Sequence, residues 1–368
     1  MNKLDRLIAK LCPDGVELVP LKTLAEIGTG NSDRINAIDD GAYPFYVRSK
    51  TIYRSNRYLY DEEAIIIPGE GGIGDIFHYA QGKYDLHQRA YRIHFLDEIV
   101  DTKYAYYYFT TTFKKFILMK AVNATVTSIR KPMIENFPFP LIPLPIQQEI
   151  VRILDKFTGL TAELTAELTA RKKQYEYYRN ELLTFGADVP MIPLAQITNM
   201  KAGKFIQAVD IFDKRDNIFC YPCYGANGLR GYVKNYNYEG TYLLIGRQGA
   251  FCGNVNRITD KFYATEHAVV MNARPDVNID YLFHMLVYMN LNQYASKSAQ
   301  PGLAVSNIEK LIIPVPRIVK QKRIATILDR FDALTNDITD GLPAEIEARR
   351  KQYEYYRNKL LTFKEKAA

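Results

Sequence analysis

The second half of the chain repeats the first half. Residues 171–185 read RKKQYEYYRNELLTF and residues 349–363 read RRKQYEYYRNKLLTF, so these two segments differ at only two positions. Residues 153–157 (ILDKF) recur as residues 327–331 (ILDRF), and the second copy holds four extra residues between its two matching segments. A repeat of this kind predicts two units of one architecture. The 368 residues also exceed the roughly 250 to 300 at which a single core stops growing.

Two apolar stripes at helical spacing include the repeated segments. In residues 147–185 and 321–363 apolar residues recur at steps of three and four, which predicts two long helices. Such a helix cannot bury its stripe alone, so we expect each to pack against its copy. Pro343 and Gly341 interrupt the second stripe without breaking its register, which favours a kink or a restart there. The side chains expected at the helix contact are Leu160, Leu164, Leu168, Tyr175, Tyr178, Leu334, Ile338, Leu342, Tyr353 and Tyr356.

The first stripe contains a tandem unit of four residues. Residues 161–164 and 165–168 both read TAEL. One unit lengthens a helix by about 6 Å and barely moves the apolar face, because four residues are slightly more than one turn. This pattern predicts an adjustable spacer.

Each helix follows a module of mixed secondary structure. Short apolar and aromatic runs separated by Gly, Asn, Asp and Pro predict strands, and residues 102–119 and 279–294 predict one helix per module. The predicted fold class is therefore α+β. The predicted domains are residues 1–146 (first module), 147–185 (central helix), 186–320 (second module) and 321–368 (C-terminal helix).

Both modules interleave basic and aromatic residues. Lys and Arg contact phosphates, while Arg, Gln and aromatic rings can read bases, so this pattern is typical of a DNA-reading surface. A solvated strand face is the alternative for any single residue, and the net charge of +7 permits a polyanionic partner without requiring one. The candidate DNA-binding residues are Arg48, Lys50, Arg54, Arg57, Gly71, Gly72, Arg89, Lys204, Arg230, Lys234, Arg247, Gln248 and Gly249.

Two motifs resemble chemical sites. Residues 69–74 fit GxGxxG, but no helix is predicted at its end, so we expect a tight loop and no dinucleotide site. Cys220 and Cys223 form one CxxC pair, with Cys252 and His267 as the remaining possible zinc ligands. The equivalent positions of the first module carry no ligands, so we expect no metal site. We also find no HExxH, GxSxG or GxxxxGK[ST] motif and no methyltransferase tetrapeptide, so we expect no catalytic residues in this chain.

The expected location is the cytoplasm. The charged start MNKLDR does not read as a signal peptide, and no run approaches the roughly 18 apolar residues of a membrane span. The four cysteines are too few for a disulfide scaffold.

These features together resemble the DNA specificity (S) subunit of type I restriction-modification enzymes. The resemblance spans nearly the whole chain and rests most on IQQEIVRILDKF, TAELTAEL and KKQYEYYRNELLTF with their second copies QKRIATILDRF and EIEARRKQYEYYRNKLLTF. It implies two target recognition domains, each reading half of a bipartite DNA sequence. It also implies two coiled-coil helices that pack antiparallel, with the duplicated halves in a pseudo-twofold arrangement.

The resemblance also implies partners. Two modification (M) subunits would supply S-adenosylmethionine and the adenine methyltransferase site, and restriction (R) subunits would supply ATP- and Mg-dependent translocation and cleavage. This chain would bind double-stranded DNA and hold no cofactor. The alternatives are a duplicated coiled-coil adaptor that binds only proteins and, less favoured, an autonomous nuclease.

Overall fold

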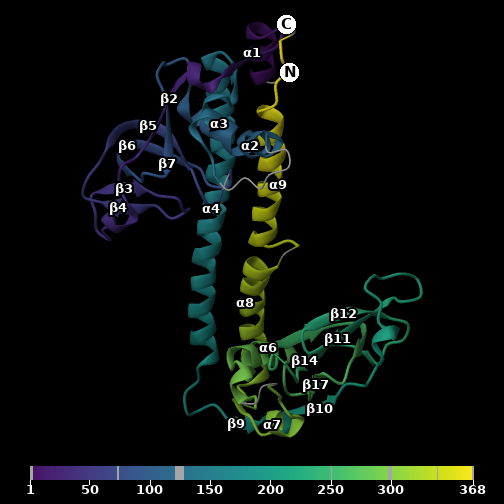
Figure 1. The fold of residues 1–368 in the computed structure, drawn as a ribbon. Helices are drawn as coiled ribbons and strands as arrows, with labels where there is room; N and C mark the ends of the chain where they lie inside the picture. The colour runs from purple at the N-terminus through teal and green to yellow at the C-terminus, as the bar shows by residue number, and fades with distance from the viewer. Residues whose placement is uncertain are drawn as a thin grey trace. The chain divides into compact units, whose positions relative to one another are not determined.

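The repeated halves fold as two units. The computed structural model describes residues 3–72, 74–120, 128–249, 251–296, 301–337 and 339–366 (Figure 1). The first unit combines residues 1–164 with residues 346–368, and the second consists of residues 165–345. The long helix α4 (Leu144–Leu183) contributes to both, so each unit holds one module, one part of α4 and one C-terminal helix. The predicted helical segments therefore share their cores with the modules.

A mixed sheet forms the centre of the first module. Its strand order is β2-β7-β5-β6-β3-β4, and all neighbours are antiparallel except β3 and β6. A separate pair joins β1 and β8. The elements are α1 (Lys3–Leu11), β1 (Glu17–Pro20), β2 (Ala25–Thr29), β3 (Tyr43–Tyr46), β4 (Tyr53–Ser55), β5 (Tyr60–Pro68), β6 (His78–Leu86), β7 (Ala90–Phe95), α2 (Thr102–Lys120), α3 (Lys131–Glu135) and β8 (Pro138–Leu141), with 3-10 turns at Leu21–Thr23 and Arg34–Asn36.

The second module has the same topology with two strands divided. Its sheets have the orders β10-β17-β14-β15 and β12-β11-β16-β13, again with one parallel pair, β11 and β16. The elements are β9 (Met191–Pro193), α5 (Leu194–Ile197), β10 (Thr198–Ala202), β11 (Tyr221–Gly225), β12 (Gly228–Val233), β13 (Tyr238–Glu239), β14 (Tyr242–Gly246), β15 (Val255–Ile258), β16 (Lys261–Ala264), β17 (Ala268–Ala273), α6 (Ile279–Tyr288), α7 (Val305–Glu309) and β18 (Ile312–Pro314), with 3-10 turns at Ala208–Asp210 and Leu291–Tyr294.

One pair of equivalent residues shows how the strands of the first module correspond to those of the second. Gly82 lies inside β6 with φ +75°, and Asp260, its equivalent in the second copy, has φ +70° between β15 and β16. Glycine adopts this left-handed conformation without steric cost, and aspartate tolerates it better than most residues. Strand β5 therefore corresponds to β13 and β14 together, and β6 corresponds to β15 and β16 together. This correspondence confirms the duplication at the level of single residues.

Each module buries its apolar residues between the sheet and the helices. In the first module, α2 packs on β5 through a cluster of aromatic rings that includes Phe109, Phe113 and Phe137. In the second module, α6 packs on β14, β17 and the helix α8 (Ile318–Asn336). The predicted module helices at 102–119 and 279–294 are thus confirmed, the second as α6 followed by a 3-10 turn.

Two equivalent buried glutamines fix the start of the long helices. Gln147 donates to the carbonyls of Ile99 and Ile142 and accepts from the amide of Asp101. Gln321, its counterpart in the second copy, donates to the carbonyl of Pro316 and accepts from the amide of Asn278. Both glutamines are fully buried, so each satisfies backbone groups that would otherwise lack a partner.

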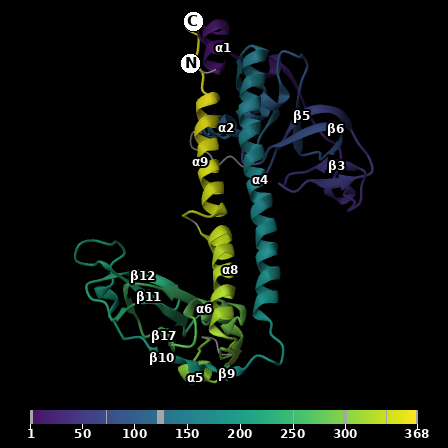
Figure 2. The same ribbon diagram turned by 180° about the vertical axis from the view of Figure 1, so that it is seen from behind.

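Within each unit α4 packs antiparallel against one C-terminal helix. In the first unit Phe157 stacks on Tyr356 of α9 (Leu342–Leu360), with 5.4 Å between the ring centroids. In the second unit Tyr175 and Tyr178 stack on Phe331 of α8, at 6.0 and 5.5 Å. Figures 1 and 2 show these helices side by side from opposite directions. The predicted coiled-coil contact is therefore confirmed.

The second predicted helix, 321–363, is not continuous. Helix α8 ends at Asn336, and α9 begins at Leu342. The carboxylate of Asp337 accepts hydrogen bonds from the amides of Thr339 and Asp340, which turns the chain. A side chain at Gly341 would come within 2.6 Å of two carbonyl oxygens, so the turn is tight. Pro343 then stands in the first turn of α9, where its missing amide proton costs nothing, so the restart alternative is confirmed.

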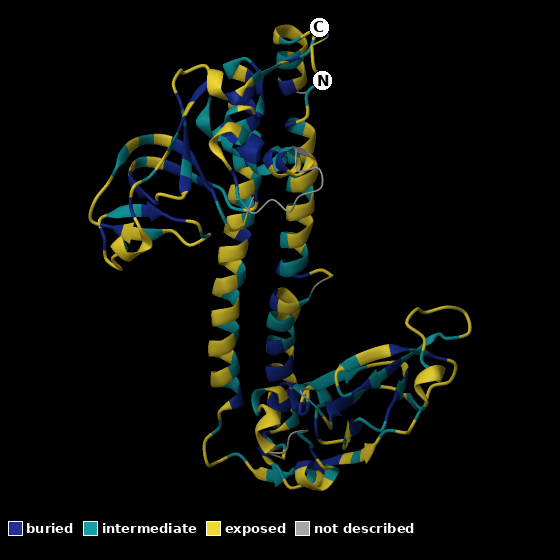
Figure 3. Cartoon of the chain, in the orientation of Figure 1, coloured by how far each residue is buried: buried dark blue, intermediate teal, exposed yellow. Residues whose placement is uncertain are grey.

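Buried, half-buried and exposed residues alternate along the long helices (Figure 3), and the predicted contact residues differ in how far they are buried. Leu164 and Leu342 are buried, whereas Leu160, Leu168, Tyr175, Tyr353 and Tyr356 are half-buried. Tyr178 is 39% exposed although it stacks on Phe331, and Leu334 is 37% exposed. Thr335 is buried in place of Leu334, because its hydroxyl donates to the carbonyl of Phe331 and needs no other partner. Ile338 lies outside the described residues.

Candidate nucleic-acid interface

The Gly-rich loops of the two modules are held by the same backbone hydrogen bonds. The amide of Gly69 donates to the carbonyl of Arg89 at 2.9 Å, and the amide of Ile129 donates to Gly69 at 2.7 Å. In the second module Arg247 donates to His267 at 2.9 Å, and Leu303 donates to Arg247 at 2.8 Å. Each loop is thereby fixed between the turn that follows β6 or β16 and a third segment.

Glycines leave open space at the tip of both loops. Gly71 has φ +70° and Gly249 has φ +80°, and a side chain added at either position would meet no atom of the described residues within 4 Å. The two positions are equivalent, because they match at the same offset as the RKKQYEYYRNELLTF segment and its copy. Gly72 is different, because a side chain there would collide with Ile76 at 2.6 Å. The open positions let another molecule approach the backbone closely.

A carboxylate joins two predicted arginines in the first module. Glu70 forms ion pairs with Arg48 and with Arg89, both at 3.0 Å. All three side chains are roughly half exposed. His87 lies beside them, and its Nδ1 accepts a hydrogen bond from the amide of Arg89 at 2.9 Å. Burial and then the charge of Arg48 lower the pKa of His87, which fits an accepting, neutral ring.

Arg48, Glu70 and His87 line a pocket of about 260 Å³ in the first module. Its other lining residues include Arg34, whose guanidinium donates to the hydroxyl of Tyr53 at 2.9 Å. Arg34, Glu70 and His87 were not among the predicted residues, because they come from three separate loops. An alignment of the two halves could have indicated Glu70, because Glu70 is equivalent to the candidate Gln248.

The other candidates of the first module have different environments. Arg54 donates to the carbonyls of Gly41 and Ala42 at 2.8 and 2.9 Å. Arg57 donates to Asn31 at 2.6 Å and lies 3.6 Å from the buried carboxylate of Asp85. These bonds link each guanidinium group to a neighbouring segment, and both side chains are exposed, so their role as DNA-binding residues stays a prediction. Lys50 is exposed in the loop between β3 and β4.

In the second module the equivalent cluster is less charged. Gln248 is exposed, and its amide oxygen lies 3.0 Å from Nδ1 of His267. Arg247 is half-buried and donates to the carbonyl of Glu266 at 3.0 Å. The same backbone frame thus presents Glu70 and Arg89 in one module and Gln248 and His267 in the other.

The remaining candidates of the second module are exposed. Lys204 forms a backbone bridge with Thr265, beside the turn that carries His267. Lys234 lies over the ring of Phe219 at 5.1 Å. Arg230 is close to Gly225, where an added side chain would come within 2.7 Å of its Cδ. The same added side chain at Gly225 would come within 3.4 Å of the Thr265 hydroxyl, so Arg230 lies near the turn that carries His267, as do Lys204 and Gln248, whereas Lys234 follows the end of β12.

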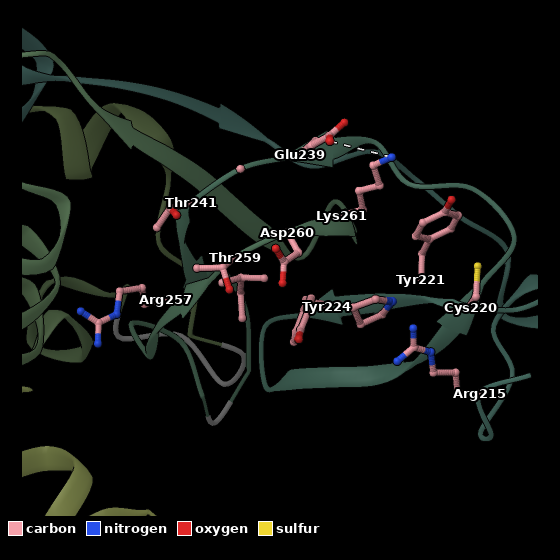
Figure 4. A pocket seen from close by; sticks show the side chains of 13 residues that line it. Arg215, Cys220, Tyr221, Tyr224, Glu239, Thr241, Arg257, Thr259, Asp260 and Lys261 are labelled. Carbon is pink, nitrogen blue, oxygen red and sulfur yellow. Dashed lines mark ion pairs between the residues drawn. The ribbon is translucent and has the colours of Figure 1, made fainter.

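A larger open pocket of about 1040 Å³ lies on the outer part of the second module (Figure 4). Charges of both signs line it, among them Arg215, Glu239, Asp260 and Lys261, and Lys261 lies 3.8 Å from Glu239. Tyr221 and Cys220 also line the pocket. Arg257 lines the pocket as well, so its lining carries three cationic side chains and two carboxylates.

Two of the four cysteines have buried thiols. Cys223 is fully buried, and burial raises the pKa of its thiol to about 11. The Cys252 thiol donates to the carbonyl of Arg247. Among the described residues no three His, Cys, Asp or Glu side chains are grouped so that they could bind a metal ion. The GxGxxG segment likewise leads through a turn into β6 and not into a helix, so the dinucleotide alternative lacks its structural context.

No helix in the described part of the chain has the length and apolar composition needed to cross a membrane.

Comparison with known proteins gives a consistent result. The family described as "Type I restriction modification DNA specificity domain" matches residues 13–171 and again residues 187–348. The type I restriction enzyme EcoprrI specificity subunit of Escherichia coli is 51% identical over 235 residues, which cover 59% of this chain and 59% of that protein. The EcoR124I/EcoR124II specificity subunit of Escherichia coli is 36% identical over 293 residues, which cover 71% of this chain and 70% of that protein.

Solved structures show the same fold. The type I restriction-modification system S subunit from M. genitalium superimposes with a TM-score of 0.66 at 17% identity, covering 94% of this chain and 95% of that one. A chain from a structure described as "complex assembly and conformational transition of the type I R-M system" gives a TM-score of 0.54 at 12% identity, covering 95% of this chain and 98% of that one. Because the family matches both halves, the chain belongs to the type I restriction-modification DNA specificity family.

Proposed function

We propose that each module reads one half of a bipartite DNA sequence and that the chain directs partner subunits to that sequence. The observation that carries the proposal is the pair of loops with identical backbone bonding and different side chains. A shared frame presents each loop to DNA in the same way, while Glu70 and Arg89 in one module and Gln248 and His267 in the other contact different base edges. Two such modules in one chain therefore read two different half-sites.

The chemistry of the loops fits groove recognition. Arginine forms two hydrogen bonds with guanine, glutamine does so with adenine, and a carboxylate accepts from cytosine. The open space at Gly71 and Gly249 leaves room for a phosphate or a base next to the backbone. The net charge of +7 favours encounter with a polyanion.

The partners proposed for the chain are two methyltransferase (M) subunits and restriction (R) subunits. S-adenosylmethionine, ATP and Mg would then act on those partners, and this chain would contribute recognition without catalysis. Membership of the specificity family and the fold shared with a chain of a type I R-M assembly support this division. A cytoplasmic location is part of the same proposal.

DNA binding and methyl transfer test the proposal together. The purified chain alone should not transfer methyl groups from labelled S-adenosylmethionine, whereas the chain with its M subunits should methylate a defined bipartite sequence. Binding to that sequence should weaken steeply with salt, because phosphate contacts release counterions. A protein-only adaptor would show no binding that depends on DNA sequence, and methyl transfer by the isolated chain would contradict the non-catalytic role.

A further inference from the structure

One of the two 3-10 turns in each module lies at an equivalent place, Arg34–Asn36 in the first and Ala208–Asp210 in the second. In the first module the amides of Asn36 and Ala37 donate to the carbonyls of Asp33 and Arg34, and Ile38 donates to Arg54. In the second module Asp210 and Ile211 donate to Gln207 and Ala208, and Phe212 donates to Tyr232. Residues 33–38 and 207–212 match one to one at the same offset as Gln147 and Gln321, so the turn is retained although the side chains have changed.

The centre of each turn is an aliphatic residue directed into solvent. Ile35 is 88% exposed and Val209 is 73% exposed. The residues three positions later, Ile38 and Phe212, are 46% and 43% exposed. Single exposed aliphatic residues are common on protein surfaces. Their occurrence at one equivalent position in two diverged modules is not explained by packing within either module.

Each turn adjoins the candidate DNA-reading loop of its own module. Ser32, before the first turn, forms a backbone bridge with His87, and Asp33 accepts a hydrogen bond from Gln88 at 3.0 Å. In the second module Lys204 forms the corresponding bridge with Thr265. The turns after β6 and β16 carry Arg89 and His267, which are proposed to read bases. The backbone bridges therefore join the segment before each 3-10 turn to the turn that carries one of these side chains.

The position of the turns beside the proposed DNA-reading loops favours DNA as the molecule that covers these residues. Arg34 lies next to Ile35 and lines the same pocket as Arg48. Lys204 precedes the second turn, and Lys214 and Arg215 follow it. Aspartates also flank both turns, Asp33, Asp39 and Asp40 in the first module and Asp210, Asp213 and Asp216 in the second, so charge alone does not select the partner. The apolar feature of the DNA major groove is the methyl group of thymine, which an aliphatic side chain beside a base-reading loop can contact.

We propose that Ile35 and Val209 are specificity-determining residues that contact the C5-methyl group of a thymine, Ile35 in one half-site and Val209 in the other. The inference rests on the proposed function and adds an apolar contact to the polar groups described above. It requires no movement of the fold, because both side chains already project from the surface.

A cycle of protein and DNA substitutions tests the contact. The chain assembled with its M subunits is used, and methylation mapping first defines the two half-sites. Duplexes are then prepared in which each thymine of one half-site is replaced in turn by uracil, which lacks the methyl group. For the wild-type chain, one uracil in the half-site read by the first module should weaken binding by about 3- to 10-fold. Ile35→Ala should weaken binding to the thymine duplex by a similar factor and should make binding insensitive to that uracil, because interacting changes are not additive.

The second module provides an internal comparison. Val209→Ala should abolish the response to one uracil in the other half-site and leave the response to the first intact. Leu96→Ala and Val319→Ala remove side chains that are 66% and 78% exposed elsewhere in the two units, so they should leave every uracil response unchanged. Thermal unfolding should be the same for all four variants because all the side chains are exposed.

Two results would overturn the inference while leaving the proposed function intact. The first is sequence-specific binding that no thymine-to-uracil change weakens in wild type. The second is a uracil response that persists undiminished in Ile35→Ala and Val209→Ala. Reduced assembly with M subunits in these variants, with normal uracil responses, would instead identify the turns as protein contacts. If the wild-type assembly shows no sequence preference at all, the proposed function itself fails.

Discussion

Deletion of one TAEL unit should shorten the unspecified gap between the two half-sites. The tandem unit lies in α4 between two aromatic contacts, Phe157 with Tyr356 in the first unit and Tyr175 with Phe331 in the second. The boundary between the two units falls between Leu164 and Thr165, at the junction of the two TAEL copies. Removing Thr165 to Leu168 therefore shortens the helix that connects the two units without removing either aromatic contact.

The size of the effect follows from helix geometry. Four residues correspond to about 6 Å of rise and a rotation of about 400°, which is about 40° beyond a full turn. One base pair corresponds to about 3.4 Å and roughly 35°. The rotations nearly agree, whereas the translation exceeds that of one base pair by a few Å. A modest bend in the DNA can absorb this excess at a cost of a few kcal/mol or less.

The assay is methylation mapping of the deletion variant expressed with M subunits. We expect both half-sites to be unchanged and the gap to be shorter by about one base pair. The double substitution Thr165→Ala with Leu168→Ala serves as the control, because it alters the unit and keeps the length of the helix, so its gap should be unchanged. An active deletion variant with an unaltered gap would refute the spacer role, whereas loss of stability alone would indicate that the unit only fills the helix contact.

Two further predictions concern charged residues. Glu70→Ala should free Arg48 and Arg89, raise the affinity for unrelated duplex DNA by about 3- to 10-fold and steepen the salt dependence of binding by up to about two phosphate equivalents. Glu70→Gln, which copies Gln248, should have a smaller effect. Equal affinities and salt slopes for wild type and Glu70→Ala would contradict this role. Hydrogen bonds from Arg152 and Lys3 lower the pKa of Glu149 from its usual 4.5 to about 2. A lowered folded-state pKa stabilises the protein above pH 4.5, and this stabilisation is lost as the pH falls toward 2. Urea unfolding should therefore show Glu149→Gln less stable than wild type at pH 7, with a difference that shrinks between pH 5 and pH 3; a constant difference would show that charge is not the cause.

The sequence predicted the features that depend on local periodicity. The duplication, α2, α6 and α4 follow from repeats and from steps of three and four, because these patterns are set by the geometry of a single helix. A kink or a restart at the position of the break between α8 and α9 was predicted from Pro343 and Gly341. The exposure of Leu334 was not predicted, because the apolar pattern cannot show that the hydroxyl of Thr335 bonds to its own helix and is buried instead.

The polar clusters depend on tertiary structure. Glu70 forms ion pairs with two arginines that lie 22 and 19 residues away on different loops, and no spacing pattern in the sequence predicts this arrangement. The bonds of Arg54 and Arg57 to carbonyl and carboxylate groups in other segments of the chain could not be predicted from the sequence either. In a single sequence, these sites can be indicated only by aligning the two modules, which pairs Glu70 with Gln248.

Exchange of one recognition module tests the central claim most directly. Residues 187–320 are replaced by the equivalent module of another family member, and the hybrid is expressed with its M subunits. Methylation mapping should show one half-site replaced by that of the donor, with the other half-site unchanged. Alteration of both half-sites, or an unaltered methylated sequence, would contradict the account in which each module reads its own half.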